Sequence, residues 1–373
     1  MSWHMCRLGD VVTLKRGHDL PDSRRQDGDV PVVSSSGITG HHNEAKAKAP
    51  GVISGRYGTL GEVFYLDEDY WPLNTSLYVA DFKGSHPRFV AYFLQSVLRN
   101  YQSDKAAVPG VNRNVLHELR VRCPDVKLQE RIVDILSAYD DLIENNRRRM
   151  ALLEEAARQL YREWFVRLRF PGHEHVRIRN GVPEGWQKRW LSDVARVNEE
   201  TLPGSYDGEI EYIDISSVTP ASINVTTLYD FKDAPSRARR VVKHGDIIWS
   251  CVRPNRKSYS VIWQPAPNLI ASTGFAVITP TALPTAFLLQ ATTTESFVGY
   301  LENHARGAAY PAVLASDFER AEILVPNATL VRDFNEQTEP LLWQANNLHL
   351  QNDELRAARD LLLLRLMNGE IAV

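Results

Sequence analysis

The chain has 373 residues, of which 43% are hydrophobic and 24% charged, and its formal net charge is -3. This length exceeds a typical single core and favours two or more domains. The charge argues against a globally basic nucleic-acid binder, so such a role would depend on local patches. Three isolated cysteines, Cys6, Cys123 and Cys251, suggest neither a disulfide framework nor a thiolate metal site. No apolar run reaches membrane-span length and the first residues lack the apolar segment of a signal peptide, so we expect a cytoplasmic protein.

Short segments punctuated by glycine predict strands in the first third of the chain, among them "GVISGRYG", "EVFYL" and "SLYVADF". A helix is predicted to begin after Pro87 in "PRFVAYFLQSVLRNY", and a long helix follows over residues 126–169. The Gly- and Pro-rich "RFPGHEHVRIRNGVPEGWQ" indicates a linker, and its "HEH" lacks the helical spacing of a metal site. A second mixed domain contains the strand-like "DIIWSCV", and a second long helix covers residues 328–373.

The two halves of the chain are related by an internal repeat. Early residues return about 183 positions later, as the pairs Trp3 and Trp186, Leu8 and Leu191, Asp10 and Asp193, and Val11 and Val194. "PLNTSLYVADF" resembles "LIASTGFAVIT" at an offset of about 198, and "VPGVNRNVLHELRVRCP" parallels "YPAVLASDFERAEILVP" at 202. The growing offset predicts a second half with the same plan and extra loop.

Both long helices show the alternating spacing of a coiled-coil seam. In the first helix the predicted seam is Leu128, Ile132, Ile135, Tyr139, Leu142, Asn146, Arg149, Leu153, Ala156 and Leu160. The seam 202 positions later is Leu330, Phe334, Gln337, Leu341, Gln344, Leu348, Gln351, Leu355, Ala358 and Leu362. The matched register favours packing of the two helices against each other. Pro340 lies inside the second, which we expect to break or bend there, with residues 341–367 as its continuous part.

The stretch "DDLIENNRRRM" interrupts the apolar seam of the first helix. Asn146 falls at a seam position, where a buried asparagine fixes register at some cost in stability. We therefore predict that Asn146 sets the helix register. Arg147, Arg148 and Arg149 face either DNA, an acidic partner surface or solvent.

On these residues the chain resembles the specificity (S) subunits of type I restriction-modification systems. The matching segments are "LGDVVTLKRG", "PLNTSLYVADF", "KLQERIVDILSAYDDLIENNRRRMALLEEAARQLYREWF" and "VPEGWQKRWLSDVARV". The resemblance covers essentially the whole chain, and its helix segments are the most specific part.

The resemblance implies an α+β protein with two mixed α/β target-recognition domains, separated by a long antiparallel two-helix coiled coil with pseudo-twofold symmetry. The domains would be residues 1–125 and 170–327, and the spacer helices residues 126–169 and 328–373. The subunit would not be an enzyme itself. It would read a bipartite site in double-stranded DNA and bind two modification (adenine methyltransferase) subunits, with restriction (translocase/nuclease) subunits in the full complex. It would hold no cofactor, and S-adenosylmethionine, ATP and Mg²⁺ would bind the partner subunits.

Candidate DNA contacts lie in two basic stretches at corresponding places in the repeat. No acid occurs between Glu44 and Glu62, or between Asp246 and Glu295. Basic side chains neutralise phosphates, and arginine also reads guanine. In the first half the candidates are Lys46, Lys48, Arg56, Tyr57, Asn74, Thr75, Asn112 and Arg113. In the second half they are Arg253, Arg256, Lys257, Tyr259, Ser272, Thr273, Arg306 and Tyr310.

Two other classes of function stay open at this point. Asp22, Glu44 and Lys46 formally fit the permissive pattern of a Mg²⁺-dependent nuclease, although they lie in polar, Gly-rich sequence rather than on clear strands. A coiled-coil adaptor unrelated to DNA would leave the basic stretches unexplained. The sequence contains neither a phosphate-binding GxxxxGK[ST] loop nor the NPPY or DPPY motif of an adenine methyltransferase.

Overall fold

The computed structural model describes residues 3–56, 61–99, 101 and 112–371. The chain divides into two compact units, each described by itself. Unit 1 consists of Met1–Asn145 and Gln351–Val373, and unit 2 of Asn146–Leu350. Each unit therefore contains one mixed domain and part of each long helix, whereas the sequence divides domains from helices.

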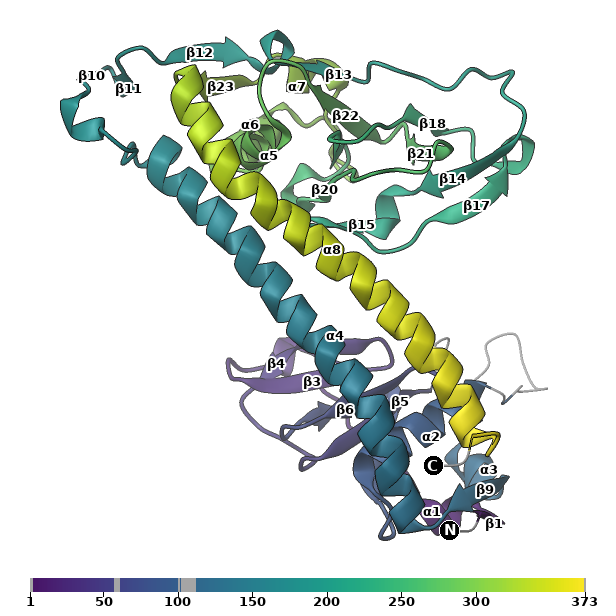
Figure 1. Cartoon of the computed structure of the whole chain (residues 1–373). Helices are drawn as coiled ribbons and strands as arrows, with labels where there is room; N and C mark the ends of the chain where they lie inside the picture. Colours follow the sequence, from purple (N-terminus) through teal and green to yellow (C-terminus); the bar gives the residue numbers. More distant parts are fainter. Residues whose placement is uncertain (1–2, 57–60, 100, 102–111, 372–373) are drawn as a thin grey trace. The chain divides into compact units, whose positions relative to one another are not determined.

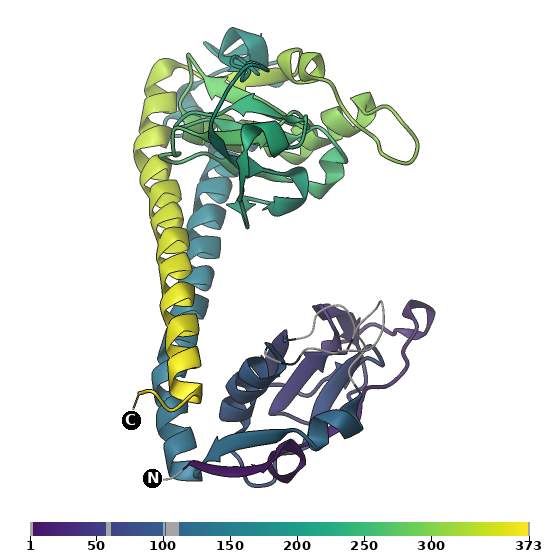
Figure 2. The same ribbon diagram turned by 90° about the vertical axis from the view of Figure 1, so that its right-hand side faces the viewer.

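The described part of unit 1 contains short strands and three α-helices in addition to its parts of the long helices. Its elements in order are β1 (Trp3–Arg7), α1 (Leu8–Val11), β2 (Thr13–Arg16), β3 (Val30–Ser34), β4 (Gly37–His42), β5 (Gly51–Gly55), β6 (Val63–Leu66), β7 (Trp71–Pro72), β8 (Ser76–Asp81), α2 (Pro87–Arg99), α3 (Arg113–His117) and β9 (Arg120–Pro124). Helix α2 lies against one face of the sheet that holds β5 and β6, because its buried face is almost wholly apolar (Figures 1 and 2).

Unit 2 repeats this plan with additions. After the β10 (Ile178–Arg179) and β11 (Val182–Pro183) hairpin come β12 (Gln187–Trp190), β13 (Ala195–Val197), β14 (Glu209–Ile213), β15 (Val218–Thr219), β16 (Ser222–Ile223), β17 (Thr227–Asp230), β18 (Ala238–Val241), β19 (Ile247–Ser250), β20 (Tyr259–Val261), β21 (Leu269–Ser272), β22 (Phe275–Pro280), α5 (Thr285–Thr292), α6 (Glu295–His304), α7 (Ala315–Glu319) and β23 (Glu322–Val325). Helices α5 and α6 share a buried core with β19 and β22.

The strands of the two units follow the same order. One antiparallel sheet runs β2-β8-β5-β6 in unit 1 and β13-β22-β19-β20 in unit 2. A second sheet runs β4-β3-β7 in unit 1, and in unit 2 it runs β17-β14-β21-β18 with one added strand. The register agrees as well: His4 pairs with Cys123 in unit 1, and Gln187 pairs with Val325 in unit 2. These are the residue pairs that offsets of 183 and 202 relate.

Two long helices complete the units: α4 (Val126–Tyr161), which continues into a π-helical turn at Arg162–Val166, and α8 (Ala328–Met367). In unit 1, Leu128, Ile132 and Leu136 of α4 share a buried core with Leu363 and Leu366 of α8. In unit 2, the other end of α4 shares a core with the beginning of α8 through Tyr161, Trp164, Phe165, Leu330 and Phe334. Both helices are therefore packed on each other within each unit.

The predicted seam is wrong at every second position, where the buried residue is the one that follows the predicted residue. On α4 the buried residues include Leu136, Ile143 and Ala157, whereas the predicted Leu142 and Ala156 are exposed. On α8 the buried residues are Thr338, Ala345 and Asn352, and the predicted Gln337, Gln344 and Gln351 are exposed. Arg149 is also exposed, while Asn146 is completely buried as predicted. The shift is the same in both helices because the repeat carries the whole pattern.

The predicted break at Pro340 is also wrong, since α8 runs as one helix through it (Figure 1). Proline lacks the amide hydrogen that would bond the Glu336 carbonyl. Both Glu336 and Pro340 are exposed, so water can reach that carbonyl. On the buried side the Thr338 hydroxyl donates a 2.9 Å hydrogen bond to the Phe334 carbonyl.

Candidate nucleic-acid interface

Three loops of unit 2 meet beyond the ends of β19 and β21. The Cys251 amide donates to the Gly274 carbonyl at 2.8 Å, and the Val313 amide donates to the Cys251 carbonyl at 2.9 Å. The Arg253 amide donates to the Pro311 carbonyl at 2.7 Å. These bonds bring together predicted contact residues that are far apart in sequence, namely Arg253, Arg256, Lys257, Thr273, Arg306 and Tyr310.

The central loop is a short 3-10 turn, Pro254–Arg256, with left-handed residues on both sides. Arg253 has φ +51 and Lys257 has φ +52. Non-glycine residues rarely adopt this conformation, and it persists only where the surroundings enforce it. The Arg253 guanidinium lies 4.8 Å from the centre of the Tyr310 ring and donates to the Ala309 carbonyl at 3.2 Å. Tyr310 itself is 71% exposed, so the pair lies at the surface.

The basic stretches are free of acids in sequence but not in space. Lys257 pairs with Glu295 at 2.6 Å, and Arg306 lies 3.5 Å from Asp317. A hydrogen bond from Lys257 lowers the pKa of the Glu295 carboxyl. Glu295 begins α6 and ends the acid-free stretch, and Asp317 belongs to α7, outside that stretch. Glu295 is exposed, and exposed ion pairs contribute little net energy, so a phosphate oxygen can replace its carboxylate at low cost. Asp317 is buried, so this argument does not extend to the pair with Arg306.

Two of the predicted contacts in unit 2 are buried. Tyr259 is 7% exposed and stacks on Trp249 with ring centres 5.6 Å apart. Ser272 is fully buried and its hydroxyl accepts a bond from the Gly274 amide. Neither side chain has surface to offer to DNA in this structure. Thr273, between Ser272 and Gly274, is exposed.

The corresponding loops of unit 1 meet in a similar way. The Arg56 amide donates to the Thr75 carbonyl at 3.2 Å, which joins the end of β5 to the loop before β8. The Asn74 side chain bonds to Asp19, and the Arg16 side chain donates to the Asn74 carbonyl at 3.3 Å. Arg56, Asn74 and Thr75 are therefore neighbours in unit 1.

The two predicted lysines of unit 1 have acidic partners. Lys46 bonds to Glu44 and lies 5.0 Å from the centre of the Trp71 ring. Lys48 pairs with Asp69 at 2.6 Å, and that hydrogen bond lowers the pKa of the Asp69 carboxyl. Both cations are nevertheless at the surface.

The remaining candidates of unit 1 are Asn112 and Arg113, at the start of α3, and Tyr57. Asn112 caps α3 by accepting a 3.0 Å bond from the Asn114 amide, and Arg113 is the exposed first residue of that helix. Tyr57 lies outside the described residues. Four further residues near these loops were not among the predicted DNA contacts: Arg16 and His18 in unit 1, and Arg237 and Asn255 in unit 2. Arg237 belongs to the basic "SRARR" segment, and its carbonyl accepts the Thr273 amide at 2.7 Å.

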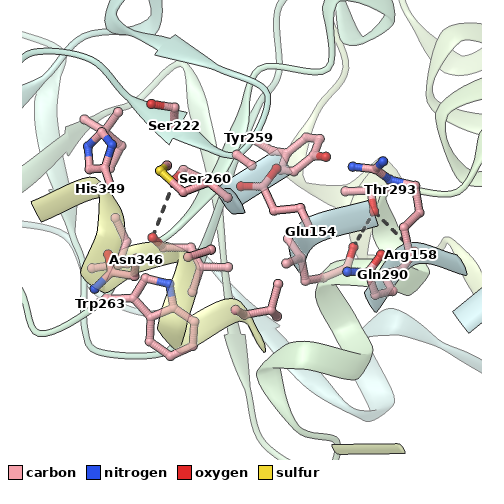
Figure 3. Close-up of a pocket in the computed structure, with 18 of the residues that line it drawn as sticks. Glu154, Arg158, Ser222, Tyr259, Ser260, Trp263, Gln290, Thr293, Asn346 and His349 are labelled. Carbon is pink, nitrogen blue, oxygen red and sulfur yellow. Dashed lines mark hydrogen bonds between the residues drawn. The ribbon is translucent and has the colours of Figure 1, made fainter. Parts of the chain in front are cut away.

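A half-open cavity of about 150 Å³ lies between the domain of unit 2 and its two helix segments (Figure 3). On one side are Glu154, Arg158, Tyr259 and Gln290, and on the other are apolar residues together with Trp263, Asn346 and His349. Burial raises the pKa of the Glu154 carboxyl, and nearby Arg158 partly offsets this. Apart from the buried Tyr259, the cavity contains none of the predicted DNA contacts.

The segment of α4 from Asn146 to Arg149 contains one buried polar residue followed by three exposed arginines. Asn146 is buried, and Arg147, Arg148 and Arg149 are exposed. A second buried asparagine, Asn352 of α8, donates to the Ile143 carbonyl at 3.3 Å. Asn352 was not predicted to be buried, because the predicted seam placed the neighbouring Gln351 inside.

The described residues do not support the nuclease pattern. Asp22 lies in a 3-10 turn and pairs with Arg25 at 2.8 Å, while Glu44 pairs with Lys46. Nowhere in the described ranges do three or more His, Cys, Asp or Glu side chains gather in a way that could hold a metal ion. "HEH" forms an exposed 3-10 turn, and all three cysteines are free thiols. Within the same ranges, no helix combines the length and apolarity that a membrane crossing needs.

Comparison with known proteins shows which proteins this chain is similar to. A family model described as "Type I restriction modification DNA specificity domain" matches residues 1–155. The type I restriction enzyme MjaIX specificity subunit of Methanocaldococcus jannaschii is 23% identical over 287 residues, which are 73% of this chain and 65% of that protein. The HindI specificity subunit of Haemophilus influenzae is 20% identical over 341 residues, covering 72% of this chain and 73% of that protein. This chain thus spans slightly less than two thirds of the length of the first relative.

The fold is also similar to a solved structure. The type I restriction-modification S subunit from M. genitalium superposes with a TM-score of 0.59 at 15% identity, over 98% of this chain and 96% of that one. The resemblance to type I specificity subunits that the sequence indicates is therefore confirmed.

Proposed function

We propose that this chain recognises DNA for a type I restriction-modification complex and performs no catalysis itself. The observation that supports this most strongly is the shared strand order and register of the two units, whose amino-acid sequences after β5 and β19 differ. A repeated scaffold with different loops suits a protein that reads two different half-sites. Residues 1–125 and 170–327 would be the target-recognition domains.

The long helices are proposed to form the spacer between these domains. Residues 126–169 and 328–373 would pair as an antiparallel coiled coil, supported by the shared cores of α4 and α8 in each unit. A stiff spacer suits a bipartite site, because two modules on one face of B-DNA need a separation near one helical turn, about 34 Å, or a multiple of it. The internal repeat would give the subunit its pseudo-twofold symmetry.

Asn146 is proposed to set the register of this coiled coil, with Asn352 as a second buried amide. An Asn146→Leu variant should keep or gain stability but methylate sites with altered or mixed half-site spacing. Both are measured on the assembled complex, by urea denaturation and by mapping of methylated sites. If stability and spacing both stay unchanged, Asn146 has no role in register.

The helices also offer surface to protein partners. Several leucines are exposed along them: Leu142, Leu361 and Leu364 in unit 1, and Leu152 and Leu350 in unit 2. Exposed apolar residues that gather on one element are typical of interaction sites. We assign this surface to two modification subunits, which would bind S-adenosylmethionine, and to restriction subunits, which would use ATP and Mg²⁺. The complex would work in the cytoplasm.

The test is a genome-wide map of N6-methyladenine in the source strain with and without this gene. We expect deletion to remove methylation at one bipartite motif and to leave other motifs unchanged. That result would also give both half-sites and their spacing. An unchanged map, with the partner methyltransferase shown to be expressed, would contradict the proposal and favour a coiled-coil adaptor.

A further inference from the structure

The turn Pro254–Arg256 of unit 2 is fixed at both ends. The amides of Arg256 and Lys257 donate to the carbonyls of Arg253 and Pro254, each at 2.9 Å. The residues on both sides hold left-handed backbone conformations, and Pro254 restricts its own φ angle. The Arg253 amide binds the Pro311 carbonyl at 2.7 Å, which ties the turn to the loop after α6. A side chain on this turn therefore starts from a defined backbone position.

The cations of this segment differ in what surrounds them. The Arg253 guanidinium is held by the Tyr310 ring and the Ala309 carbonyl, and the Lys257 ammonium is held by Glu295. Arg256, at the end of the turn, is exposed, and its guanidinium forms no hydrogen bond or ion pair with the described parts of the chain. The neighbouring Asn255 is likewise exposed. The flanking cations hold the turn, and Arg256 extends from it.

We infer that Arg256 determines sequence specificity in unit 2 by reading a guanine in the major groove. This inference rests on the proposed DNA-recognition function. A guanidinium donates two parallel N–H bonds to O6 and N7 of guanine, a pattern that no other base presents in that groove. A backbone fixed before binding lowers the ordering cost of such a contact. An arginine that bound only phosphate would not distinguish sequences.

The experiment expresses this chain together with its partner subunits and maps the methylated motif for four proteins: the unaltered chain, Arg256→Lys, Arg256→Gln and the control Arg179→Gln. Arg179 is an exposed arginine of β10, in a hairpin remote in sequence from the turn. We expect both Arg256 variants to lose preference for guanine at one position of one half-site, by on the order of tenfold or more. The other half-site, the spacing and the Arg179→Gln motif should be unchanged.

Each remaining outcome would overturn the inference. A uniform drop in methylation with an unchanged motif would mean that Arg256 contacts phosphate. An unchanged motif at unchanged efficiency would mean that Arg256 is a solvated side chain. If the unaltered chain yields no bipartite motif with its partners, the proposed function fails, and the inference fails with it. Because Arg256 makes no side-chain bonds, these variants should fold as well as the parent, and thermal denaturation of each complex checks this.

Discussion

In both units α4 packs against α8, but the side chains between the two helices differ. At the end of α8, unit 1 buries Leu363, Leu366 and Met367. The residues 202 positions earlier, at the end of α4, are Tyr161, Trp164 and Phe165, which unit 2 buries. Opposite them lie Ile132 in unit 1 and Phe334 in unit 2, again 202 positions apart. The helix contact is thus aliphatic in unit 1 and aromatic in unit 2.

A second pair of positions differs more strongly. In unit 1, Arg359 of α8 pairs with Asp140 of α4 at 2.6 Å, and Asp140 also accepts a hydrogen bond from Tyr92. The corresponding positions in unit 2 are Ala157 and Leu342, both in the apolar core. The backbone plan therefore depends on which positions are buried and tolerates an ionic pair or an apolar pair there. Replacing only one residue of the ionic pair would leave the other charge without its partner, so the two positions must change together.

The largest effect is expected for the aromatic contact. Phe334 touches the rings of Tyr161, Trp164, Phe165 and Phe287 at centre distances of 5.1 to 6.1 Å. Phe334→Ala should lower the free energy of unfolding by about 3–5 kcal/mol, and Ile132→Ala by about 2–4 kcal/mol, because the larger ring leaves the larger cavity. Urea denaturation measures the losses, and hydrogen exchange assigns them to unit 2 and unit 1. Equal losses, or exchange changes in the wrong unit, would contradict the comparison.

An intermediate effect is expected for the ionic pair. Asp140→Ala leaves the Arg359 guanidinium and the Tyr92 hydroxyl without this carboxylate, at a cost of about 1–3 kcal/mol, which Asp360 reduces through its own bonds to Arg359. The double change Asp140→Leu with Arg359→Ala copies the residues of unit 2 and should restore most of that stability. Urea denaturation of the two variants and the parent tests this. A double variant less stable than Asp140→Ala would show that the ionic pair cannot be exchanged.

The smallest effect concerns buried carboxyls, which are a feature of unit 2. Among the described residues, burial raises carboxyl pKa values at Glu154 and Asp246, both in unit 2. A pKa above its unfolded value means that the folded state binds the proton more readily, so stability rises as pH falls through the raised pKa. Glu154→Gln resembles the protonated acid and should unfold at a slightly higher urea concentration than the parent at pH 8. The difference should shrink towards pH 4.

The adjacent Glu155 is the matched control. Hydrogen bonds from Gln159 and Arg158 lower the pKa of its carboxyl, so its charged form contributes stability above the unfolded pKa. Glu155→Gln should therefore unfold at a slightly lower urea concentration at pH 8, which is the opposite sign. Shifts of the same sign in both variants would mean that charge burial does not control this region.

The sequence was sufficient for the long helices and for the strand repeat, but not for the phase of the seam. Apolar Leu142 attracted the prediction, although the structure exposes it. The positions between the helices are partly polar, with Thr338 and Asn352 buried and Arg359 half-buried on α8. A hydrophobic pattern cannot reveal a seam that is filled by hydrogen-bonded polar groups, because their burial depends on partners in the other helix.

For the candidate site, the sequence indicated a set of residues at corresponding places in the repeat, but not their contacts. The bonds from Arg56 to Thr75 and from Cys251 to Gly274 are seen only in the structure. Tyr259 and Ser272 are buried because both faces of their strands are covered, as the burial of the neighbouring Ser260 and Ala271 shows, and one sequence does not reveal this cover. The carboxylates of Glu295 and Asp317 reach the basic residues through the fold of α6 and α7, which no count of charges along the chain could show.

The division of the chain into units has a consequence for its synthesis on the ribosome. Unit 2 is one continuous segment, whereas unit 1 combines the first 145 residues with Gln351–Val373. Gly369 lies against Trp3, because a Cβ built on Gly369 would be 3.3 Å from the indole nitrogen of Trp3. Unit 2 can pack as soon as Leu350 has left the ribosome, but unit 1, although made first, must wait for the last turns of α8. Until then the apolar face of α4 at Leu128, Ile132 and Leu136 lacks its partner, so the nascent chain is most exposed to aggregation at its oldest part.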